Sequence, residues 1–264
     1  MKRDRASSDG GRRAVGLSAG HIRDPYLREI RLRRERVPSF DVYPFDLPVV
    51  RALDTLALHP SVTFLVGENG SGKSTLLEAI AVACGFNAEG GTRAFNFATR
   101  ASHSPLHEYL HVIRGPRMPR DGFFLRAESL FNVATQVEQL GVTGYGDRSL
   151  HEQSHGESFM ALMTTRFTGD GLYLMDEPEA ALSPSRQMSL LTIMHRFVRR
   201  GSQLVVATHS PILMAYPDAT ILALGEDGIR PVAYEDTEHF SVTRDFLDRY
   251  PSMLRVLLED EDET

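Results

Sequence analysis

The sequence predicts an α/β protein with a mostly parallel central sheet flanked by helices. Residues 62–66 are an apolar, β-branched run typical of a buried strand, and residues 76–83 have the composition of a helix that ends near Gly85. Two further apolar runs, residues 172–175 and 204–207, each end in polar residues. Parallel strands of an open α/β sheet bring their carboxyl ends to one edge, where ligands bind, so these polar residues are expected to share a site.

The composition is that of one large domain. The chain has 264 residues and 42% hydrophobic residues, enough for a sizeable core. Its single cysteine, Cys84, excludes a disulfide framework and is expected to be buried. No apolar run approaches the roughly twenty residues of a membrane span, and no secretory signal follows the basic N-terminus. These features predict a cytoplasmic protein.

Charge divides the chain into three parts. We expect residues 1–22 to form a disordered basic arm, residues 23–258 a single domain, and residues 259–264 an acidic tail. The arginines of residues 1–36 make nucleic acid a possible partner. A solvated tail beside a solvated strand face is favoured over nucleic-acid binding, because the whole chain carries a net charge of −6.

The N-terminal part of the domain predicts strands. Residues 26–36 alternate between apolar and charged side chains, and residues 40–45 are interpreted as a second extended stretch that ends near Pro48. We therefore expect antiparallel strands near the N-terminus, ahead of the strand at residues 62–66.

The next segment, residues 67–75, has the spacing of a phosphate-binding loop, G-x-x-x-x-G-K-[ST]. Glycines let consecutive N–H groups point at one anion, and the following helix adds the positive end of its dipole. Lys73 is expected to place its charge on the terminal phosphates, and the Ser74 hydroxyl to bind Mg²⁺. A glycine-rich turn with a chance Lys-Ser pair is the weaker alternative, because the strand and the helix flank the loop in the required order. The loop residues are Gly67, Glu68, Asn69, Gly70, Ser71, Gly72, Lys73, Ser74 and Thr75.

Residues 86–158 are expected to form a small helical insert between the two halves of the core. Ser104-Pro105 has the features of a helix start, residues 122–127 are interpreted as a strand, and residues 129–140 as a helix with one apolar side. Within the insert His103, His107 and His111 follow at spacings of four. Surface histidines are favoured over a zinc site there, because zinc sites usually show a fuller ligand set.

The C-terminal half supplies the remaining motifs. Residues 154–158, Ser-His-Gly-Glu-Ser, precede a helical run at residues 159–163. The strand at residues 172–175 ends in Asp176 and Glu177, Ser183-Pro184 opens another helix, and the strand at residues 204–207 leads to His209. Strands at residues 219–224 and 228–234 and a helix at residues 241–258 complete the domain.

Five motifs in this order resemble the ATP-binding cassette class of ATPases. More closely, the chain resembles the compact ATPases grouped as "AAA family", related to the RecF, SMC and OLD-type nucleotide-binding domains. The phrases Asp-Glu-Pro-Glu-x-x-Leu-Ser-Pro and Ala-Thr-His-Ser-Pro carry this likeness, which extends over residues 26–258. It implies a P-loop NTPase fold of cassette type and Mg²⁺-dependent hydrolysis of ATP, with ATP sandwiched between the two copies of a homodimer.

The resemblance also implies roles for individual residues. Glu177 matches the general base, and His209 matches the switch histidine that contacts the γ-phosphate together with Lys73. Asp176 matches the aspartate that holds Mg²⁺ through water, and Glu128 falls where the residue of the Q-loop would be. Ser154, Gly156 and Glu157 match the signature motif that reaches the γ-phosphate of the opposite protomer; a serine at this position is also a plain helix cap.

Two departures bear on the biological role. His155 replaces the usual first glycine of the signature, and Ser183 replaces the aspartate usual in transporters. We therefore favour an ATPase that drives a conformational change in an unknown partner, possibly in DNA repair or defence, over the ATPase subunit of a transporter. A regulatory module with little turnover is a third alternative, which the intact Asp176 and Glu177 disfavour. Tyr43 or Phe45 could stack on adenine, but strand packing is favoured.

Overall fold

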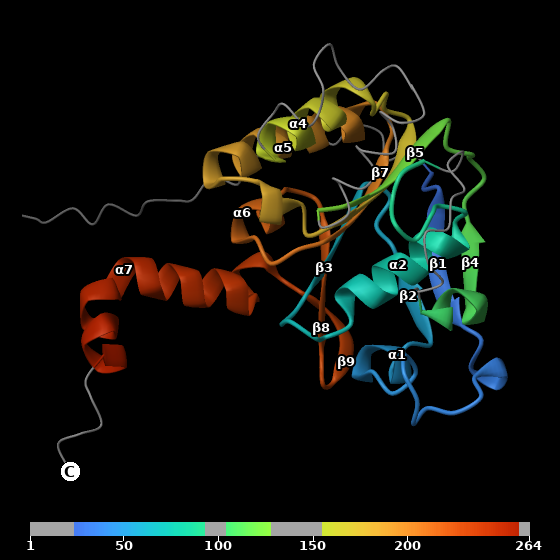
Figure 1. Ribbon diagram of the computed structural model, residues 1–264, viewed down its shortest axis with the longest axis horizontal. Helices are drawn as coiled ribbons and strands as arrows, with labels where there is room; N and C mark the ends of the chain where they lie inside the picture. Colours follow the sequence, from blue (N-terminus) through green and yellow to red (C-terminus); the bar gives the residue numbers. More distant parts are fainter. Residues whose placement is uncertain (1–23, 93–103, 128–154, 259–264) are drawn as a thin grey trace, which may run out of the picture.

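The computed structural model describes residues 24–92, 104–127 and 155–258. Over these ranges the chain forms two sheets with helices packed around and between them (Figure 1). The predicted arm at residues 1–22, the acidic tail, and the helix predicted at residues 129–140 lie outside the described residues.

The larger sheet has six strands in the order β5-β6-β7-β3-β8-β9. All neighbours are parallel except the last pair, which is antiparallel. The strands β3, β6 and β7 are buried along their whole length, which is why their sequences are continuous apolar runs. The strands are β3 (Val62–Val66), β5 (Asp121–Arg126), β6 (Gly171–Asp176), β7 (Gln203–Ala207), β8 (Thr220–Gly225) and β9 (Gly228–Val232).

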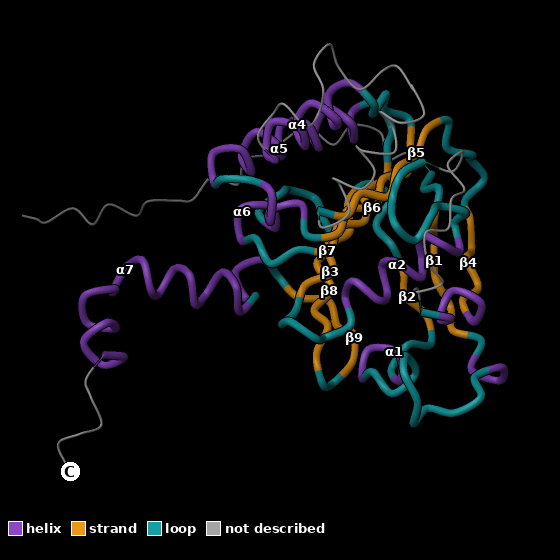
Figure 2. The backbone as a smooth tube through the Cα atoms, viewed as in Figure 1, coloured by secondary structure: helices purple, strands orange, loops and turns teal. Residues whose placement is uncertain are grey.

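Two hydrophobic cores lie on the two faces of this sheet. Side chains alternate between faces along a strand, so Val62, Phe64 and Val66 enter one core and Leu65 enters the other. The first core is covered by α4 (His155–Thr165), α5 (Pro184–Arg199) and α6 (Pro211–Met214). The second contains α1 (Pro48–Arg51), α2 (Lys73–Ala83) and the smaller sheet, and Cys84 is buried in it as predicted (Figure 2).

The smaller sheet is antiparallel, with the order β2-β1-β4, and confirms the expected N-terminal strands. It consists of β1 (Leu27–Leu32), β2 (Thr55–Ala57) and β4 (Leu110–Arg114). The extended stretch predicted at residues 40–45 is wrong, because these residues form turns. Val42 O accepts hydrogen bonds from Phe45 N and Asp46 N, and the Ser39 hydroxyl accepts one from Asp41 N, so polar turn residues and Pro44 outweigh the aromatic pattern.

Residues 104–127, the described middle part of the predicted insert, contain no α-helix. The helix expected at Ser104 is only the 3-10 turn η2 (Pro105–Tyr109), although the Ser104 side chain caps it as predicted. The chain then adds β4 to the small sheet and β5 to the large one. Pairing of β4 with β1 therefore overrides the helical pattern expected after Ser104. The strand predicted at residues 122–127 is confirmed as β5 and forms one edge of the central sheet.

The histidine series in this region does not form a helical face. His111 lies in β4, and the His107 ring contacts Ser104 O at 3.2 Å within η2. His103 lies outside the described residues. Within the described ranges no group of three or more histidine, cysteine, aspartate or glutamate residues is placed to hold a metal ion.

A buried glutamine joins the two sheets. Gln203, at the start of β7, is fully buried, and its Oε1 accepts hydrogen bonds from Tyr26 N at 3.0 Å and Leu27 N at 2.8 Å. Its Nε2 donates to Leu27 O at 2.8 Å and His59 O at 2.9 Å. One side chain thus satisfies backbone groups of β1 and of the segment that enters β3.

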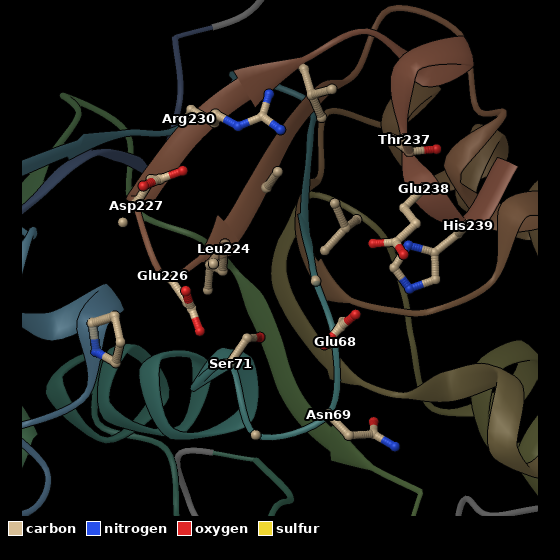
Figure 3. A pocket seen from close by; sticks show the side chains of 18 of the residues that line it. Glu68, Asn69, Ser71, Leu224, Glu226, Asp227, Arg230, Thr237, Glu238 and His239 are labelled. Carbon is tan, nitrogen blue, oxygen red and sulfur yellow. The ribbon is translucent and has the colours of Figure 1, made fainter. Parts of the chain in front are cut away.

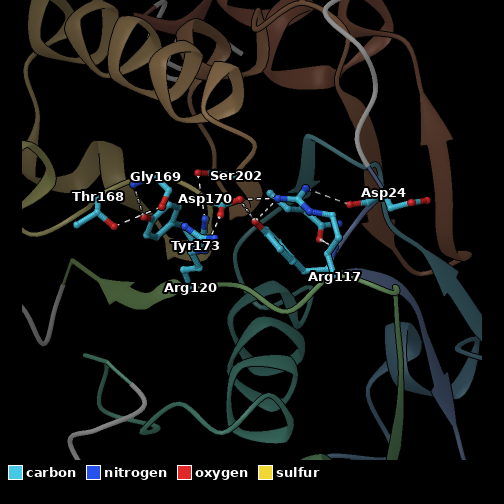
Figure 4. Close-up of polar contacts among 11 residues, drawn as sticks. Asp24, Arg117, Arg120, Thr168, Gly169, Asp170, Tyr173 and Ser202 are labelled. Carbon is cyan, nitrogen blue, oxygen red and sulfur yellow. Dashed lines mark hydrogen bonds and ion pairs between the residues drawn. The ribbon is translucent and has the colours of Figure 1, made fainter.

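A second polar group reinforces the same junction (Figure 4). The Tyr26 hydroxyl donates to Asp170 Oδ1 at 2.7 Å, and Arg117 contacts both the Tyr26 hydroxyl and the Asp170 carboxylate. The Arg117 guanidinium also lies over the Tyr26 ring, 4.8 Å from its centroid. Residues before β1, before β5 and before β6 therefore meet at the amino-terminal end of the sheet.

The final helix, α7 (Glu238–Leu258), begins one turn earlier than the predicted 241–258 and has no buried residue. It extends away from the body of the protein in Figure 1. Its backbone is non-helical at Arg249, just before Pro251, which removes a helix hydrogen bond. Most of the large apolar side chains that are exposed in the described chain lie on this helix, including Leu247, Val256 and Leu258. Among the described helices none is long and apolar enough to cross a lipid bilayer.

Gln203→Leu is expected to destabilise the protein by about 3 kcal/mol or more, because two buried N–H groups lose their acceptor at about 1–3 kcal/mol each. Urea unfolding followed by circular dichroism measures this change. Ser189→Ala, on the exposed face of α5, is the control and is expected to stay within about 0.5 kcal/mol of the wild type. Equal stability of Gln203→Leu and the wild type would show that the glutamine does not hold the sheets together.

Candidate functional site

The candidate site lies where β3, β6 and β7 end together. Leu65 pairs with Ala207, and Asp176 pairs with Ala207 on the other side. Backbone bonds continue past the strand ends, from Thr208 N to Leu65 O at 3.1 Å and from Glu177 N to Ala207 O at 2.9 Å. The three segments that follow these strands therefore begin at the same level of the sheet.

The glycine-rich loop leaves β3 through backbone conformations that favour glycine. Gly67, Gly70 and Gly72 have φ angles of 151°, 81° and 90°. A Cβ atom on Gly67 would lie 2.2 Å from Leu224 O, so the loop can pass β8 only without a side chain there. Gly72 is the N-cap of α2 and offers no side-chain hydrogen bond, which leaves the first N–H groups of the helix available to an anion.

Lys73 lies inside the loop. Its side chain is buried, and Nζ donates to Gly67 O at 2.9 Å and Glu68 O at 2.8 Å. Burial lowers the pKa of the ammonium, while Glu177 and Asp176 act to raise it. The loop thus holds one cation at its centre, with carboxylates beside it.

Ser74 and Asp176 meet directly, although 102 positions separate them. Ser74 Oγ donates to Asp176 Oδ1 at 2.9 Å, so the first turn of α2 touches the end of β6. An alcohol and a carboxylate side by side are the hard oxygen donors that Mg²⁺ prefers, and these residues fit that ion. Arg126 lies at the end of β5. Its Nε is 3.6 Å from Asp176 Oδ2, and its Nη1 is 2.7 Å from Glu78 Oε2. No pattern in the sequence marked this arginine.

Glu177 and His209 form a second pair at the same edge. His209 Nε2 lies 3.5 Å from Glu177 Oε1. Glu177 adopts a left-handed backbone conformation (φ 48°, ψ 51°), which is unfavourable for a residue with a Cβ. Such strained residues cluster at functional sites. Burial and the Lys73 charge lower the pKa of His209, against the opposing effect of Glu177, which favours the neutral ring.

Two neighbours of this pair were not predicted. Glu179, within the Asp-Glu-Pro-Glu phrase, accepts a hydrogen bond from His209 N, and burial raises the pKa of its carboxyl. His239, in the first turn of α7, has its Nε2 3.0 Å from His209 Nδ1. The phrase itself pointed to Glu179, but no local pattern marked His239.

The signature residues are only partly described. Gly156 and Glu157 lie in the first turn of α4, on the opposite face of the sheet from α2. Glu157 is exposed and contacts Arg186 of α5 at 3.4 Å. Ser154 and Glu128 lie outside the described residues. The structure therefore brings together the loop, Asp176, Glu177 and His209 within one chain, and holds the described signature residues on another helix.

The two aromatic candidates for adenine stacking differ. Phe45 is buried and packs edge-on against Tyr109, with centroids 4.8 Å apart, as the packing interpretation predicted. Tyr43 is 60% exposed, and its hydroxyl lies 3.4 Å from Thr75 Oγ1 in the first turn of α2. Only Tyr43 presents an open ring beside the loop.

A cavity of about 510 Å³ lies on the β8–β9 side of the loop (Figure 3). Its lining includes Arg230 and His239 but not Lys73, Asp176 or Glu177. A negatively charged lining repels phosphate, so we place the phosphates at the start of α2 and not in this cavity. The carboxylates that line it are Glu68, Glu226, Asp227, Asp236 and Glu238.

Comparison with known proteins places the chain in a family. A family described as "AAA domain, putative AbiEii toxin, Type IV TA system" matches residues 92–215, and one described as "AAA domain" matches residues 47–118. The hemin import ATP-binding protein HmuV of Streptomyces coelicolor is 32% identical over 194 residues, which cover 66% of this chain and 69% of that protein. The chain belongs to the P-loop ATPases of the ATP-binding cassette type.

Two further similarities have lower sequence identity. The ribose import ATP-binding protein RbsA of Bacillus cereus is 24% identical over 233 residues, covering 77% of this chain. The ATPase spans about half of that relative's length, 47%. Among solved structures, the SMC head domain from Thermotoga maritima has a TM-score of 0.45 at 14% identity and covers 79% of this chain and 99% of that one.

Gly67→Ala is expected to abolish ATP binding and lower the melting temperature, because the new methyl group would overlap Leu224 O. Gly70→Ala is the matched control, since its Cβ would meet nothing within 4 Å and its strain is only about 1–2 kcal/mol. Titration with a fluorescent ATP analogue and thermal unfolding compare the two. If both variants bind alike, the close approach to β8 does not shape the loop.

Proposed function

We propose that this protein hydrolyses ATP to ADP and phosphate with Mg²⁺, as a homodimer with ATP held between its protomers, and so drives a conformational change in a partner. One observation carries the proposal. A buried lysine, a serine–aspartate pair and a glutamate–histidine pair meet at a single edge of the sheet, at the start of one helix. Membership of the cassette-type ATPases gives the same chemistry.

In this proposal the loop binds the phosphates. Loop N–H groups and the start of α2 face the phosphate oxygens, and Lys73 turns from its two carbonyl partners toward them. The buried Ser71 hydroxyl, which makes no hydrogen bond to the described residues, supplies a further donor. Ser74 and Asp176 hold Mg²⁺, with Glu128 as a third candidate, and the ion neutralises phosphate charge when bound.

Glu177 acts as the general base. Its carboxylate stands at the end of β6, one residue beyond Asp176, and is 42% exposed, so an attacking water can reach it. His209 directs Nε2 into the same space and contacts the γ-phosphate. The exposed Tyr43 ring stacks on adenine. The Tyr43 hydroxyl lies 3.4 Å from Thr75 Oγ1, in the first turn of α2, so the ring stands beside the loop.

The placement of the signature supports the proposed homodimer. Ser154, Gly156 and Glu157 act on ATP held by the opposite protomer, because Gly156 and Glu157 lie on α4, across the sheet from the loop of their own chain. Residues 23–258 are proposed to form one ATPase domain.

A transporter role is a second candidate, favoured by the names of the relatives, which are import ATP-binding proteins. His155 and Ser183 depart from the transporter pattern and argue against it. Measuring hydrolysis with liposomes, DNA and RNA separates the two candidates: stimulation by membranes carrying a co-purifying permease supports transport, and stimulation by nucleic acid supports a repair or defence role.

Glu177→Gln is expected to bind ATP with unchanged affinity and to hydrolyse it about 10²–10⁴-fold more slowly, because the amide keeps the shape but not the base. Lys73→Ala is the contrasting variant. It is expected to lose ATP affinity, because each charge-assisted contact of the lysine with phosphate contributes about 1.5–3 kcal/mol. Phosphate release and equilibrium ATP binding are measured for both, with and without a chelator of Mg²⁺. A Glu177→Gln protein with wild-type turnover would assign the base to another residue.

Ser154→Arg is expected to bind ATP and fold normally but to hydrolyse it poorly, because the signature acts on the other protomer. Mixing Ser154→Arg with Lys73→Ala at equal amounts should recover roughly a quarter of wild-type activity, since mixed two-fold dimers contain one intact composite site. Phosphate release after dissociation and reassociation measures the recovery.

The control for that mixing experiment places both substitutions in one chain and mixes it with wild-type protein. Mixed dimers of this kind have no intact site, so they contribute no activity. Wild-type dimers make up about a quarter of the control mixture, so its activity is expected to fall on reassociation from about half to about a quarter of the wild-type value. Control activity that stays at one half, or full activity of Ser154→Arg alone, would contradict the sandwiched dimer.

A further inference from the structure

His209 has a histidine partner on α7. His239 Nε2 and His209 Nδ1 are 3.0 Å apart, within hydrogen-bond distance, and the ring centroids are 5.2 Å apart. On the other side of the His209 ring, Nε2 faces Glu177 Oε1 at 3.5 Å, is buried, and makes no hydrogen bond to the described residues. The three side chains form a row from α7 to the end of β6.

The row is consistent with one arrangement of protons. A neutral imidazole carries its proton on one nitrogen and accepts on the other. Nε2 of His209 faces a carboxylate oxygen, which is an acceptor, so the proton belongs on Nε2. Nδ1 must then accept, and His239 must donate from its own Nε2. The opposite arrangement would place two lone pairs against each other at the Glu177 end.

The first turn of α7 is held where this bond requires it. The Thr237 hydroxyl donates to Tyr234 O at 2.7 Å, and the Tyr234 hydroxyl donates to Pro211 O at 2.9 Å. Tyr234 and Phe240 pack with centroids 4.7 Å apart. Pro211 lies two residues after His209, so these contacts tie the start of α7, which carries His239, to the segment that carries His209. Figure 3 shows His239 on the side of the cavity where Glu68 of the loop lies.

We propose that His239 is a positioning residue for ATP hydrolysis: by donating to His209 Nδ1, it keeps the His209 proton on Nε2, where the ring can donate to the γ-phosphate while remaining neutral. The inference rests on the proposed function and adds a residue to it. It also makes α7 part of the nucleotide site, because the donor comes from the first turn of that helix.

Two substitutions of His239 separate donation from packing. His239→Leu fills similar space without a donor, whereas His239→Gln keeps an N–H group near the position of Nε2. His239→Leu is expected to lower kcat about 10–100-fold, the effect typical of partners that orient an active-site histidine, with KM changed less than twofold. His239→Gln is expected to stay within about threefold of the wild type.

The matched control is His195→Ala. His195 is also half-buried, and its Nδ1 is within hydrogen-bond distance, 3.2 Å, of the Tyr216 hydroxyl. Unlike His239, it lies on α5. Its loss is expected to leave kcat and KM unchanged. Equal kcat for His239→Leu, His239→Gln and the wild type would overturn the inference, as would equal losses in both His239 variants.

A second measurement does not depend on activity. Nitrogen chemical shifts of ¹⁵N-labelled histidine rings report which nitrogen carries the proton, and comparison with His209→Asn identifies the His209 signals. Wild-type protein is expected to show His209 protonated on Nε2 alone, and His239→Leu to show a mixture. A proton on Nδ1 in the wild type would overturn the inference even if ATP is hydrolysed. If the wild type does not hydrolyse ATP, the proposed function fails. The spectra then still decide whether His239 keeps the His209 proton on Nε2.

Discussion

The register between β3, β7 and β6 is the constraint on which the site depends. Leu65 and Asp176 pair with the same residue, Ala207, so the three following segments start level with one another. A shift of one residue would turn every side chain of a strand to the opposite face and separate Asp176 from Ser74. Gln203 lies at the far end of β7 and fixes the strand against β1, so a buried amide at one end of the sheet supports the alignment of catalytic groups at the other.

Charge balance supports a cation besides lysine at the proposed site. Lys73 lies among three carboxylates, Asp176, Glu177 and Glu179, each of which acts on its pKa. The phosphates of ATP would add further negative charge at short range, where the cost of like charges is high. A divalent ion at the Ser74–Asp176 pair reduces this repulsion, and the oxygen chemistry of the pair suits it.

The sequence predicted the parts of the fold that are encoded locally. The glycine loop, the three buried strands and the helix at Pro184 each have a pattern complete within about fifteen residues, and all are present. One error arises where distant pairing decides. Residues 110–114 form β4 because β1, from another part of the chain, pairs with them, and no window around Ser104 contains that information.

The same distinction applies to the site. The loop and the acids at the end of β6 were predicted because phosphate and Mg²⁺ chemistry fixes their spacing in one stretch of sequence. His239 was not, because its partner is 30 positions away and the two rings meet only through the path of β8, β9 and the turn before α7. Arg126 was missed for a similar reason, since its contacts with Glu78 and Asp176 join three separate elements.

The attachment of α7 gives this helix the geometry of a lever. Its first turn is held near the proposed nucleotide site by Thr237 and His239, and none of its residues is fully buried. With a rise of about 1.5 Å per residue, the straight part up to Arg249 measures roughly 16 Å. A tilt of about 10° at the first turn would move the bend by about 3 Å, and the apolar side chains beyond it would follow. If the proposed function holds, small rearrangements beside the γ-phosphate would be enlarged at a surface remote from the chemistry.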